Sequence, residues 1–433
     1  MCSCRSGCIR YRIDIITDAD FILSIMKITE VPIAQLKPYE KNAKKHPASQ
    51  VKAIARSIEA FGFNVPLVID AKHRIWSGHG RLEAAKLLNL ETLPCVERED
   101  LTDEQLKAYS LADNKLNESD WDMETVMEEL KQMSLELIDL TGFDSDLVLE
   151  TKEDDFDLAN IGEPTAKLGD VYQLGDHRVI CGDSEDPATY EKLLKGEKPR
   201  LIYTDAPYSI NYESGLGFSY QSEKFGGTGG RIFNDDKSPE EALAFYEKVL
   251  KQLHAFSSDD ATIYWWFASR LLEINYQALR ETDWHISQTI FWLKNSLIFS
   301  PGQLYHRIYE PCIVGWKEGE THYQNMTFSN YTELWALDKK SFADYLDVWY
   351  QKRDNTAKYI HPTQKPIQLA ERALKRSSAK GDAVLDAFGG SGSTLIACEQ
   401  LKRKARLIEL DPKYVDAIVK RWEAYTNEKA KKL

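Results

Sequence analysis

One strand–turn–helix segment near the C-terminus, AVLDAFGGSGSTLIACE (383–399), constrains the fold more than any other feature. It starts with an apolar run, typical of a buried strand, that ends at Asp386. Three glycines then predict a tight turn, and a helix is expected to begin near Ser393. Such a turn lets a ligand approach the backbone and meet the N–H groups of the helix start. The glycines of this turn are Gly389, Gly390 and Gly392.

Strands and helices alternate over the whole region from Ala166 onward. The candidate strands are apolar or aromatic runs at 200–205, 261–267, 285–293, 311–316, 383–388 and 405–410. The candidate helices are clearest at 240–254, 364–376 and 412–425. This alternation predicts an α/β fold with a mostly parallel, doubly wound sheet.

A second acidic residue, Glu409, lies in the strand that is expected after the glycine turn. Glu409 ends the next candidate strand, where a doubly wound fold places the acid that binds ribose hydroxyls. The pattern predicts an adenosine-containing cofactor and leaves NAD and S-adenosylmethionine both open. Glycines that only close a packing turn are the alternative interpretation.

Another strand that runs into a turn carries an acid at its end, in IYTDAPYS (202–209). Asp205 and the carbonyl of Ala206 can accept two hydrogen bonds from an exocyclic amino group. Pro207 stiffens the turn, and Tyr208 offers a ring on which a base can stack. The alternative is an acidic strand end beside an ordinary proline turn.

The N-terminal part has a different pattern, compact α+β from Met26 to about residue 140. Ser49 is expected to cap a helix that Gly62 ends, and two short strands follow at 66–70 and 73–78. A helix is predicted within 78–88, and Thr102 with Gln105 predicts a capping box for another. Residues 1–25 are expected to be a disordered leader, and 141–165 an acidic linker.

The net charge of −13 is concentrated in one segment. Between Asp120 and Glu163 there are 15 acidic and two basic residues, and the remainder of the chain balances. Lys339–Lys380 carries ten basic against four acidic residues. Binding to a polyanion is therefore compatible with the overall acidity.

Composition excludes several other classes of protein. No run of 18 apolar residues exists, which excludes a membrane-spanning helix. The odd count of seven cysteines argues against a disulfide scaffold and favours a cytoplasmic protein. Cys2, Cys4 and Cys8 lack a fourth partner for zinc, so no metal is predicted.

Taken together, the two strand ends resemble those of the DNA amino-methyltransferases, which methylate adenine N6 or cytosine N4. DAPY (205–208) is similar to the catalytic D-P-P-Y of that family, and DAFGGSGST (386–394) to its cofactor loop. HPTQKP (361–366), IELDPKY (408–414), VICGDSED (179–186), RIFNDD (231–236) and IFWLKN (290–295) also have counterparts. Their order resembles the permuted β-type group, and the resemblance covers about 166 to 425.

This resemblance implies a Rossmann-like methyltransferase domain over 166–433 that uses S-adenosylmethionine. The catalytic residues it implies are Asp205, Ala206, Pro207 and Tyr208. The cofactor-binding residues it implies are Asp183, His361, Thr363, Lys365, Asp386, Phe388, Gly389, Gly390, Gly392, Ser393, Thr394 and Glu409. Ala206 and Ala387 replace prolines of the family, which puts the rigidity of both turns in question, and Ser393 replaces a threonine but keeps the hydroxyl.

The N-terminal region resembles the ParB/sulfiredoxin-like fold over about 28–120, a pairing similar to phage and mobile-element methyltransferases. In the resembled fold nucleotide phosphates bind at the turn that corresponds to GHGR here, so a nucleotide or the DNA backbone is expected at Gly78, His79, Gly80 and Arg81. The alternative is a tight turn in which Arg81 pairs with Glu83 or Asp70.

The expected activity is methylation of adenine N6 in double-stranded DNA by base flipping, because the family resemblance associates Asp rather than Ser at position 205 with adenine. Cytosine N4 methylation remains an alternative, as does a catalytically silent DNA-binding or nuclease-like protein. A homodimer and a restriction–modification context are further expectations. Lys339–Lys380 and 222–231 are candidate DNA contacts, and solvated surface is the alternative interpretation of both.

Overall fold

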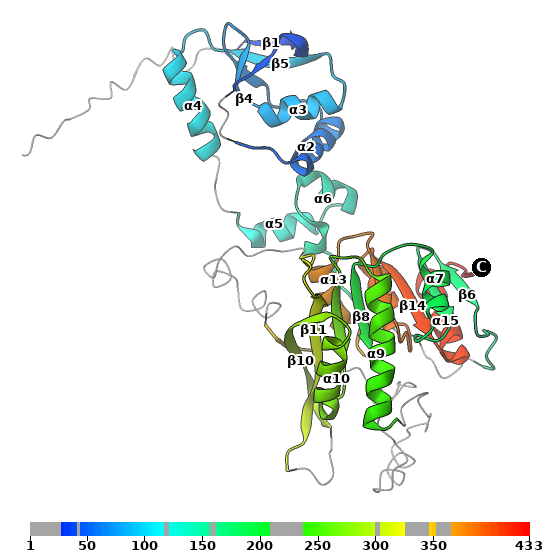
Figure 1. Cartoon of the computed structure of the whole chain (residues 1–433). Helices are drawn as coiled ribbons and strands as arrows, with labels where there is room; N and C mark the ends of the chain where they lie inside the picture. The colour runs from blue at the N-terminus through cyan, green and yellow to red at the C-terminus, as the bar shows by residue number, and fades with distance from the viewer. Residues whose placement is uncertain are drawn as a thin grey trace, which may run out of the picture. The chain divides into compact units, whose positions relative to one another are not determined.

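The structure is a computed structural model, and it describes residues 27–40, 44–116, 121–154, 156, 162–207, 237–298, 304–324, 346–351 and 365–433. The chain divides into two compact units, Met1–Val148 and Leu149–Leu433 (Figure 1). The boundary falls inside the range expected as a linker, so the second unit begins before residue 166. The expectations for 1–25 and 222–231 lie outside the described residues.

The first unit is built on a mixed five-stranded sheet with the order β1-β5-β3-β4-β2. Its strands are β1 (Ile28–Pro32), β2 (Lys37–Pro38), β3 (Leu67–Ile69), β4 (Arg74–Ser77) and β5 (Thr92–Glu97). Its α-helices are α2 (Ala48–Phe61), α3 (His79–Leu87), α4 (Asp103–Leu116), α5 (Met123–Leu130) and α6 (Leu135–Thr141), and two 3₁₀ turns lie at Ile33–Gln35 and Ser145–Leu147. The α+β pattern predicted for this region is what the structure contains.

The helix ends of the first unit follow local chemistry. Gly62 ends α2 with φ +79°, as expected, but the N-cap is Pro47 and not Ser49, which lies inside the first turn. Pro47 has no side-chain acceptor, so no side chain caps the first N–H groups of α2, and the Pro47 carbonyl accepts from the Val51 N–H at 3.1 Å. The capping box before α4 is present: Thr102 accepts from the Gln105 N–H at 3.3 Å, and Gln105 accepts from the Thr102 N–H at 2.9 Å.

The second unit contains a ten-stranded sheet with the order β12-β10-β11-β9-β8-β13-β14-β7-β6-β15. The five central strands, β9, β8, β13, β14 and β7, run parallel to one another. The strands are β6 (Val171–Leu174), β7 (His177–Cys181), β8 (Leu201–Asp205), β9 (Thr262–Trp266), β10 (Trp284–Ile298), β11 (Arg307–Lys317), β12 (Val348–Tyr350), β13 (Ala383–Asp386), β14 (Lys404–Glu409) and β15 (Lys431–Lys432).

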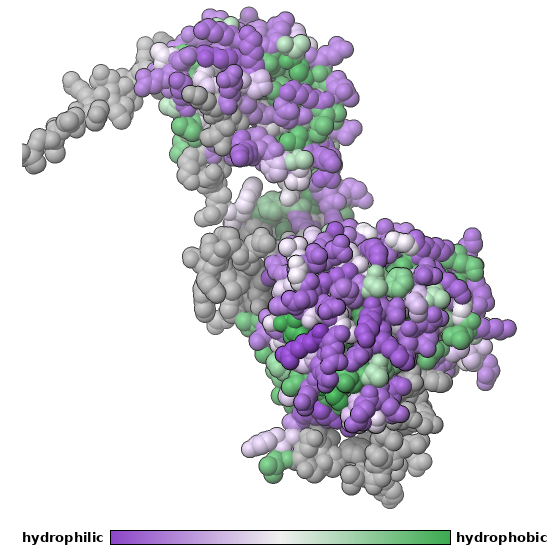
Figure 2. All heavy atoms as spheres, viewed as in Figure 1, coloured by the Kyte–Doolittle hydropathy of each residue, from purple (hydrophilic) through white to green (hydrophobic). Residues whose placement is uncertain are grey.

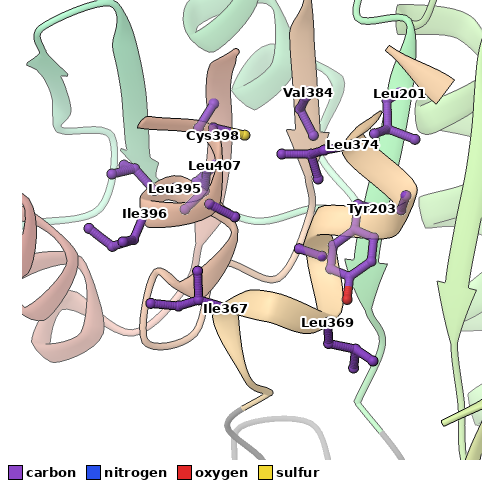
Figure 3. Close-up of a cluster of buried hydrophobic side chains, with 14 of the residues drawn as sticks. Leu201, Tyr203, Ile367, Leu369, Leu374, Val384, Leu395, Ile396, Cys398 and Leu407 are labelled. Carbon is purple, nitrogen blue, oxygen red and sulfur yellow. The ribbon is translucent and has the colours of Figure 1, made fainter. Parts of the chain in front are cut away.

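Helices cover both faces of this sheet, as a doubly wound fold requires. Alternate strand residues belong to two different cores: Leu201 and Tyr203 of β8 belong to one, and Ile202 between them to the other. α13 (Ile367–Ser377), α14 (Ser393–Gln400) and α15 (Pro412–Thr426) pack on the first face, which Figure 3 shows from close by. α7 (Pro187–Leu194), α9 (Pro239–Phe256) and α10 (Leu272–Arg280) pack on the second.

The sequence prediction of this unit was right for four of the five central parallel strands, β9, β8, β13 and β14, and missed β7 and three strands near the edges. Each candidate strand is present, but β10 and β11 extend beyond 285–293 and 311–316 and pair antiparallel with each other. The parallel strand β7 had no counterpart among the predicted strands, although VICGDSED (179–186) overlaps it. The strands β6, β12 and β15 near the edges were missed as well. These three are short or half-exposed, so they lack the apolar run that marks a buried strand.

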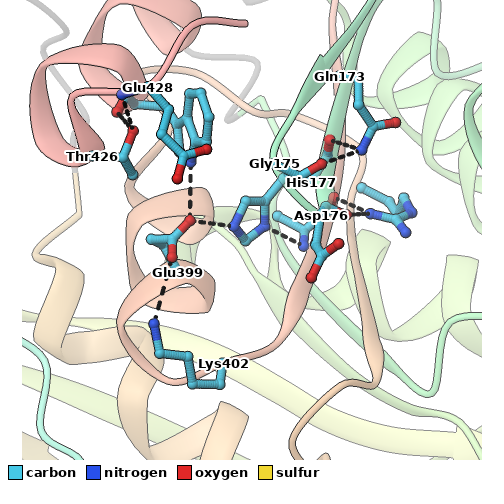
Figure 4. A network of polar contacts seen from close by, with 11 residues as sticks. Gln173, Gly175, Asp176, His177, Glu399, Lys402, Thr426 and Glu428 are labelled. Carbon is cyan, nitrogen blue, oxygen red and sulfur yellow. Dashed lines mark hydrogen bonds and ion pairs between the residues drawn. The ribbon is translucent and has the colours of Figure 1, made fainter.

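A buried histidine and its partners connect four elements of this unit (Figure 4). His177 Nδ1 accepts from the Ala405 N–H at 2.9 Å, so Nε2 is the donor to Glu399, also at 2.9 Å. Glu399 accepts from Trp422 as well, at 3.0 Å. The hydrogen bond from His177 holds the pKa of Glu399 at about 2. These hydrogen bonds join β7, β14, α14 and α15.

Residues just after the unit boundary are anchored on the same helices. Thr151 donates to Glu371 of α13 through both its N–H and its hydroxyl, each at 2.7 Å. Asp154 forms a two-pronged ion pair with Arg421 of α15, with both N···O distances 2.7 Å. Arg421 also donates to the Ser391 carbonyl at 2.8 Å. Part of the expected linker therefore braces the glycine turn.

The apolar side chains of the two cores are buried beneath the surface. The face seen in Figure 2 is mainly hydrophilic, with apolar side chains scattered over it. Among the described residues, no helix combines the length and the apolar character needed to cross a membrane.

Candidate active site

Three carboxylates lie at the same edge of the central sheet because each ends a parallel strand. Asp205 ends β8, Asp386 ends β13 and Glu409 ends β14, and these strands are neighbours. The chain continues from β8 to β9 on one side and from β13 to β14 on the other. The winding of the sheet therefore reverses between β8 and β13, which is where open α/β sheets form their ligand crevice.

Asp386 fixes the start of the glycine turn through hydrogen bonds to three neighbouring residues. Its carboxylate accepts from the Thr204 hydroxyl at 2.9 Å, from the Thr394 hydroxyl at 2.7 Å and from the Phe388 N–H at 3.1 Å. Thr204 in turn accepts from the Ala387 N–H at 3.1 Å. Burial raises the pKa of Asp386 to about 7, although these hydrogen bonds lower it. Asp386 and Thr394 thus shape the turn, and Thr204 compensates for the proline that Ala387 replaces.

The three glycines of the turn face different surroundings. A Cβ on Gly389 or Gly392 would lie 3.2 or 3.1 Å from Ile418 of α15, so these two allow the turn to pack on the helix. A Cβ on Gly390 would meet only the Phe388 carbonyl, at 3.9 Å. Gly390 has φ +51° and Gly392 φ +84°, a region that favours glycine. Gly390 is therefore where the turn presents bare backbone to open space.

Glu409 lies beside Gly390 and joins the turn to the next helix. One carboxylate oxygen accepts from the Gly390 N–H at 2.7 Å, and the other from the Asp411 N–H at 2.9 Å. Burial raises the pKa of Glu409 to about 7. Each oxygen has a further lone pair, so Glu409 can also accept from a ligand hydroxyl.

The remaining residues expected around the cofactor lie near this edge where they are described. Asp183 follows β7, and the neighbouring Gly182 N–H donates to the Glu409 carbonyl at 2.9 Å. The ring of Phe388 packs 6.0 Å from that of Phe245. Ser393 begins α14, and its hydroxyl lies 3.4 Å from that of Ser391. His361 and Thr363 lie outside the described residues.

The turn after β8 is held by a residue that the sequence analysis missed. Tyr246 of α9, buried against Trp265, donates its hydroxyl to the Pro207 carbonyl at 2.6 Å. Ala206 is itself buried in the core of this face. The hydrogen bond from Tyr246 supplies the rigidity that the sequence comparison expected to be lost with the family proline. Tyr208 lies outside the described residues.

Lys365, expected at the cofactor, contacts Asp205, the acid expected to be catalytic. Its Nζ lies 2.5 Å from Oδ2 of Asp205 and 3.4 Å from Oε2 of Glu310 on β11. Glu310 also pairs with Lys294 of β10. Lys294, Glu310 and Lys365 are all largely buried. Four charges therefore alternate in sign and end at Asp205.

Burial and pairing act in opposite directions on these charges. Burial raises the pKa of Glu310, but Lys365 and Lys294 outweigh it and hold that pKa at about 2. Burial lowers the pKa of Lys365, while Asp205 and Glu310 raise it above its ordinary value. The residues therefore stabilise one another as ions. Lys294 lies in IFWLKN, a motif whose chemical role the sequence alone did not reveal.

The GHGR turn of the first unit has the expected backbone and unexpected partners. Gly78 is the N-cap of α3 with φ +103°. His79 Nε2 accepts from the Tyr39 N–H at 3.2 Å, so this ring is engaged within the fold. The ring of His46 lies beside Gly80, where a Cβ would approach it to 3.1 Å.

Arg81 of the same turn is half-buried, and this burial lowers the pKa of its guanidinium, although the nearby charge of Asp113 acts in the opposite direction. The two acids considered as its partners are engaged elsewhere. Glu83 pairs with Lys86 at 2.7 Å, and Asp70 with Arg74 at 2.6 Å.

Comparisons with known proteins identify both units. A family model described as DNA methylase matches residues 200–420, just over half of the chain, and one for the ParB N-terminal domain matches 22–115. The ParB-like nuclease domain-containing protein YnaK of Escherichia coli is 41% identical over 80 residues, 18% of this chain and 92% of YnaK.

Type II methyltransferases resemble the second unit. M.HpaI of Haemophilus parainfluenzae is 23% identical over a match that covers 58% of this chain and 76% of M.HpaI. M2.DpnII of Streptococcus pneumoniae is 27% identical over a match that covers 55% of this chain and 88% of M2.DpnII. The solved M1.HpyAVI–SAM complex covers 56% of this chain and 98% of that chain at 22% identity, with a TM-score of 0.39. The extent of the family match decides the assignment: this chain belongs to the DNA methylase family, with a ParB N-terminal domain ahead of the methylase region.

Proposed function

We propose that this chain transfers a methyl group from S-adenosylmethionine to N6 of adenine in double-stranded DNA. The observation that carries the proposal is the position of Asp205, which ends β8 directly beside the glycine turn after β13. An acceptor for an amino group and a turn suited to a nucleoside cofactor thus lie at adjacent strand ends.

Asp205 and the Ala206 carbonyl would orient the target nitrogen. An exocyclic amino group is a poor nucleophile because its lone pair is delocalised into the ring. Hydrogen bonds from its two hydrogens to a carboxylate and a carbonyl oppose that delocalisation and direct the lone pair. The contribution of the protein is then orientation and electrostatic stabilisation.

The residues at the glycine turn fit S-adenosylmethionine, the methyl donor of this family. Gly390 leaves room for a ligand against the backbone, and Glu409 has acceptor capacity for ribose hydroxyls. Asp183, Phe388, Gly389, Gly392, Ser393 and Thr394 complete the proposed site, Asp386 and Thr394 by shaping the turn. When bound, the cofactor supplies a methyl group activated by its sulfonium charge.

Adenine is proposed over cytosine because the family resemblance associates an aspartate at position 205, rather than a serine, with adenine targets. Either base is paired inside a duplex, so the target must leave the stack. Tyr208 is the proposed stacking platform for the flipped base, and Lys339–Lys380 the proposed contact to the DNA backbone.

A single assay separates the alternatives. Purified protein, duplex DNA and labelled S-adenosylmethionine are incubated, and the DNA is hydrolysed to nucleosides. We expect label in N6-methyldeoxyadenosine. Label in N4-methyldeoxycytidine instead would replace adenine by cytosine as the target, and a lack of label in both would contradict the proposed activity. Light scattering of the same sample tests the expected homodimer.

We propose a second function for the first unit, binding of a nucleotide or the DNA backbone at the turn formed by residues 78–81. The first N–H groups of α3, which begins after the left-handed Gly78, have no partner within the helix, and Arg81 adds a planar donor. The ring of His79 is less suited than expected, because its Nε2 accepts a backbone hydrogen bond.

Substitution of Arg81 tests this second function. Arg81→Ala should weaken DNA or nucleotide binding by about 10-fold, the scale of one lost charge-assisted contact. Arg98→Ala is the matched control, since Arg98 pairs with Asp100 in the same unit. Equal binding by both variants, measured by fluorescence anisotropy, would contradict the proposal.

A further inference from the structure

The contact between Lys365 and Asp205 suggests a role for Lys365 that differs from cofactor binding. A carboxylate that orients an amino group must stay ionised, and the oxygen that accepts from that group must point in a fixed direction. Asp205 lies at a partly buried strand end, where water gives limited support to its charge. A cation 2.5 Å from Oδ2 meets both requirements.

We propose that Lys365 and Glu310 are positioning residues for methyl transfer: Lys365 holds Oδ2 of Asp205 so that Oδ1 is directed to the target amino group, and Glu310 holds Lys365. The inference rests on the proposed function and assigns Lys365 to the acid rather than to the cofactor. Lys294 completes the arrangement by neutralising Glu310.

The surroundings of Lys365 leave its ammonium little freedom. Its Nζ lies 5.3 Å from the centroid of the Trp266 ring, the last residue of β9. Trp266 is in register with Asp205 on β8 and with Cys312 on β11, two residues beyond Glu310. The tryptophan face and the two acids therefore bound the ammonium on several sides, and strand pairing fixes all of them.

The charges of the group also balance. Lys294 and Lys365 offset Glu310 and Asp205, so the buried group has no net charge. Removing one member leaves an uncompensated charge in a region of low polarity. Loss of Lys365 leaves that charge on Asp205, where the carboxylate would bind a proton more strongly and cease to act as an acceptor.

Lys365→Met tests the inference because it keeps the length of the side chain and removes the charge. We expect kcat to fall by about 100-fold at pH 7.5, the scale of a misplaced reacting group. The KM and calorimetric Kd for S-adenosylmethionine should stay within about 3-fold, and the acidic limb of the kcat profile should move to higher pH. Lys365→Arg should recover part of the lost kcat and bring the acidic limb closer to that of the wild type.

Lys317→Met is the matched control. Lys317 is as buried as Lys365 and lies at the other end of the strand that carries Glu310, where it donates to the Ser257 carbonyl at 3.0 Å. This variant should keep the wild-type kcat and pH profile. A similar loss in both variants would mean that any buried lysine matters equally, which contradicts a role specific to Asp205.

Other outcomes are equally decisive. A large rise in the Kd for S-adenosylmethionine with kcat preserved would return Lys365 to the cofactor, and an unchanged kcat would overturn its positioning role. If Lys365→Met does not fold, Glu310→Gln replaces it, with an expected loss in kcat of about 10-fold because Lys365 is no longer held in place. The acidic limb should then not move to higher pH, because loss of a neighbouring negative charge favours the ionised form of Asp205. An unchanged kcat would overturn the inference. Methylation by the wild type separates all of these from failure of the proposed function.

Discussion

The carboxylate at the end of β8 and those at the ends of β13 and β14 occupy equivalent places in the sheet and have opposite surroundings. Asp205 contacts a buried ammonium. Asp386 and Glu409 accept from hydroxyl and backbone N–H groups, and burial raises the pKa of each to about 7. The strand ends bring these acids together, but their partners differ, and we propose different chemical roles for them on this basis.

This difference shows how one sheet edge can serve two purposes. Asp386 and Glu409 accept hydrogen bonds from neutral donors and so fix the turn at which Gly390 exposes its backbone. Such contacts do not require either carboxyl group to be fully ionised. A cation at Asp205 favours a permanent charge at the point where the proposed function needs a hydrogen-bond acceptor. The comparison predicts that substitutions on the two sides will separate turnover from cofactor binding.

Asp205→Ala is expected to have the largest effect. Methyl transfer should fall by at least about 1000-fold, because the target amino group loses its charged acceptor. The affinity for S-adenosylmethionine should remain close to that of the wild type. Asp205→Asn should fail as well, since an amide can donate where a carboxylate only accepts. Turnover near the wild-type rate in either variant would remove Asp205 from the catalytic site.

Gly390→Val probes the opposite side and should give the reverse pattern. A branched side chain would occupy the open space at the turn, so the Kd for S-adenosylmethionine should rise by about 10- to 100-fold. Gly381→Val is the control, because Gly381 has φ +83° and open surroundings before β13, away from the turn. Equal Kd values for both variants in calorimetry would place the cofactor elsewhere.

Asp386→Asn should have the smallest effect, visible in the pH dependence of stability. A pKa raised from its ordinary value to about 7 means that the protonated carboxyl stabilises the fold below about pH 4, and that this stabilisation is lost as the pH rises through 7. Between pH 5 and 8 the wild type should therefore lose about 1–3 kcal/mol more unfolding free energy than the variant. Urea denaturation without cofactor measures this difference, and identical pH dependence would show that Asp386 does not titrate there.

Much of this arrangement could be predicted from the sequence because it depends on local patterns. Apolar runs ending in acids predicted β8, β13 and β14, and glycine spacing predicted the turn between Asp386 and α14. The family resemblance added their chemical roles. Neither source of information required contacts between distant parts of the chain.

The residues that sequence reasoning missed act through contacts across the fold. Tyr246 reaches the Pro207 carbonyl from α9, and Glu310 reaches Lys365 from an antiparallel strand. A tyrosine in a helix and a glutamate in a strand have no local signature for these roles. Lys365 was noticed within HPTQKP, but only the three-dimensional structure brings it to Asp205.

The most direct test of this account is the rate of methyl transfer to duplex DNA as a function of S-adenosylmethionine concentration, measured side by side for wild type, Asp205→Ala and Gly390→Val. We predict that Asp205→Ala stays inactive at every concentration while it binds cofactor normally. Gly390→Val should approach the wild-type rate once the cofactor is saturating. If both substitutions alter the same kinetic parameter, the division of roles between the two sides of the sheet edge is contradicted.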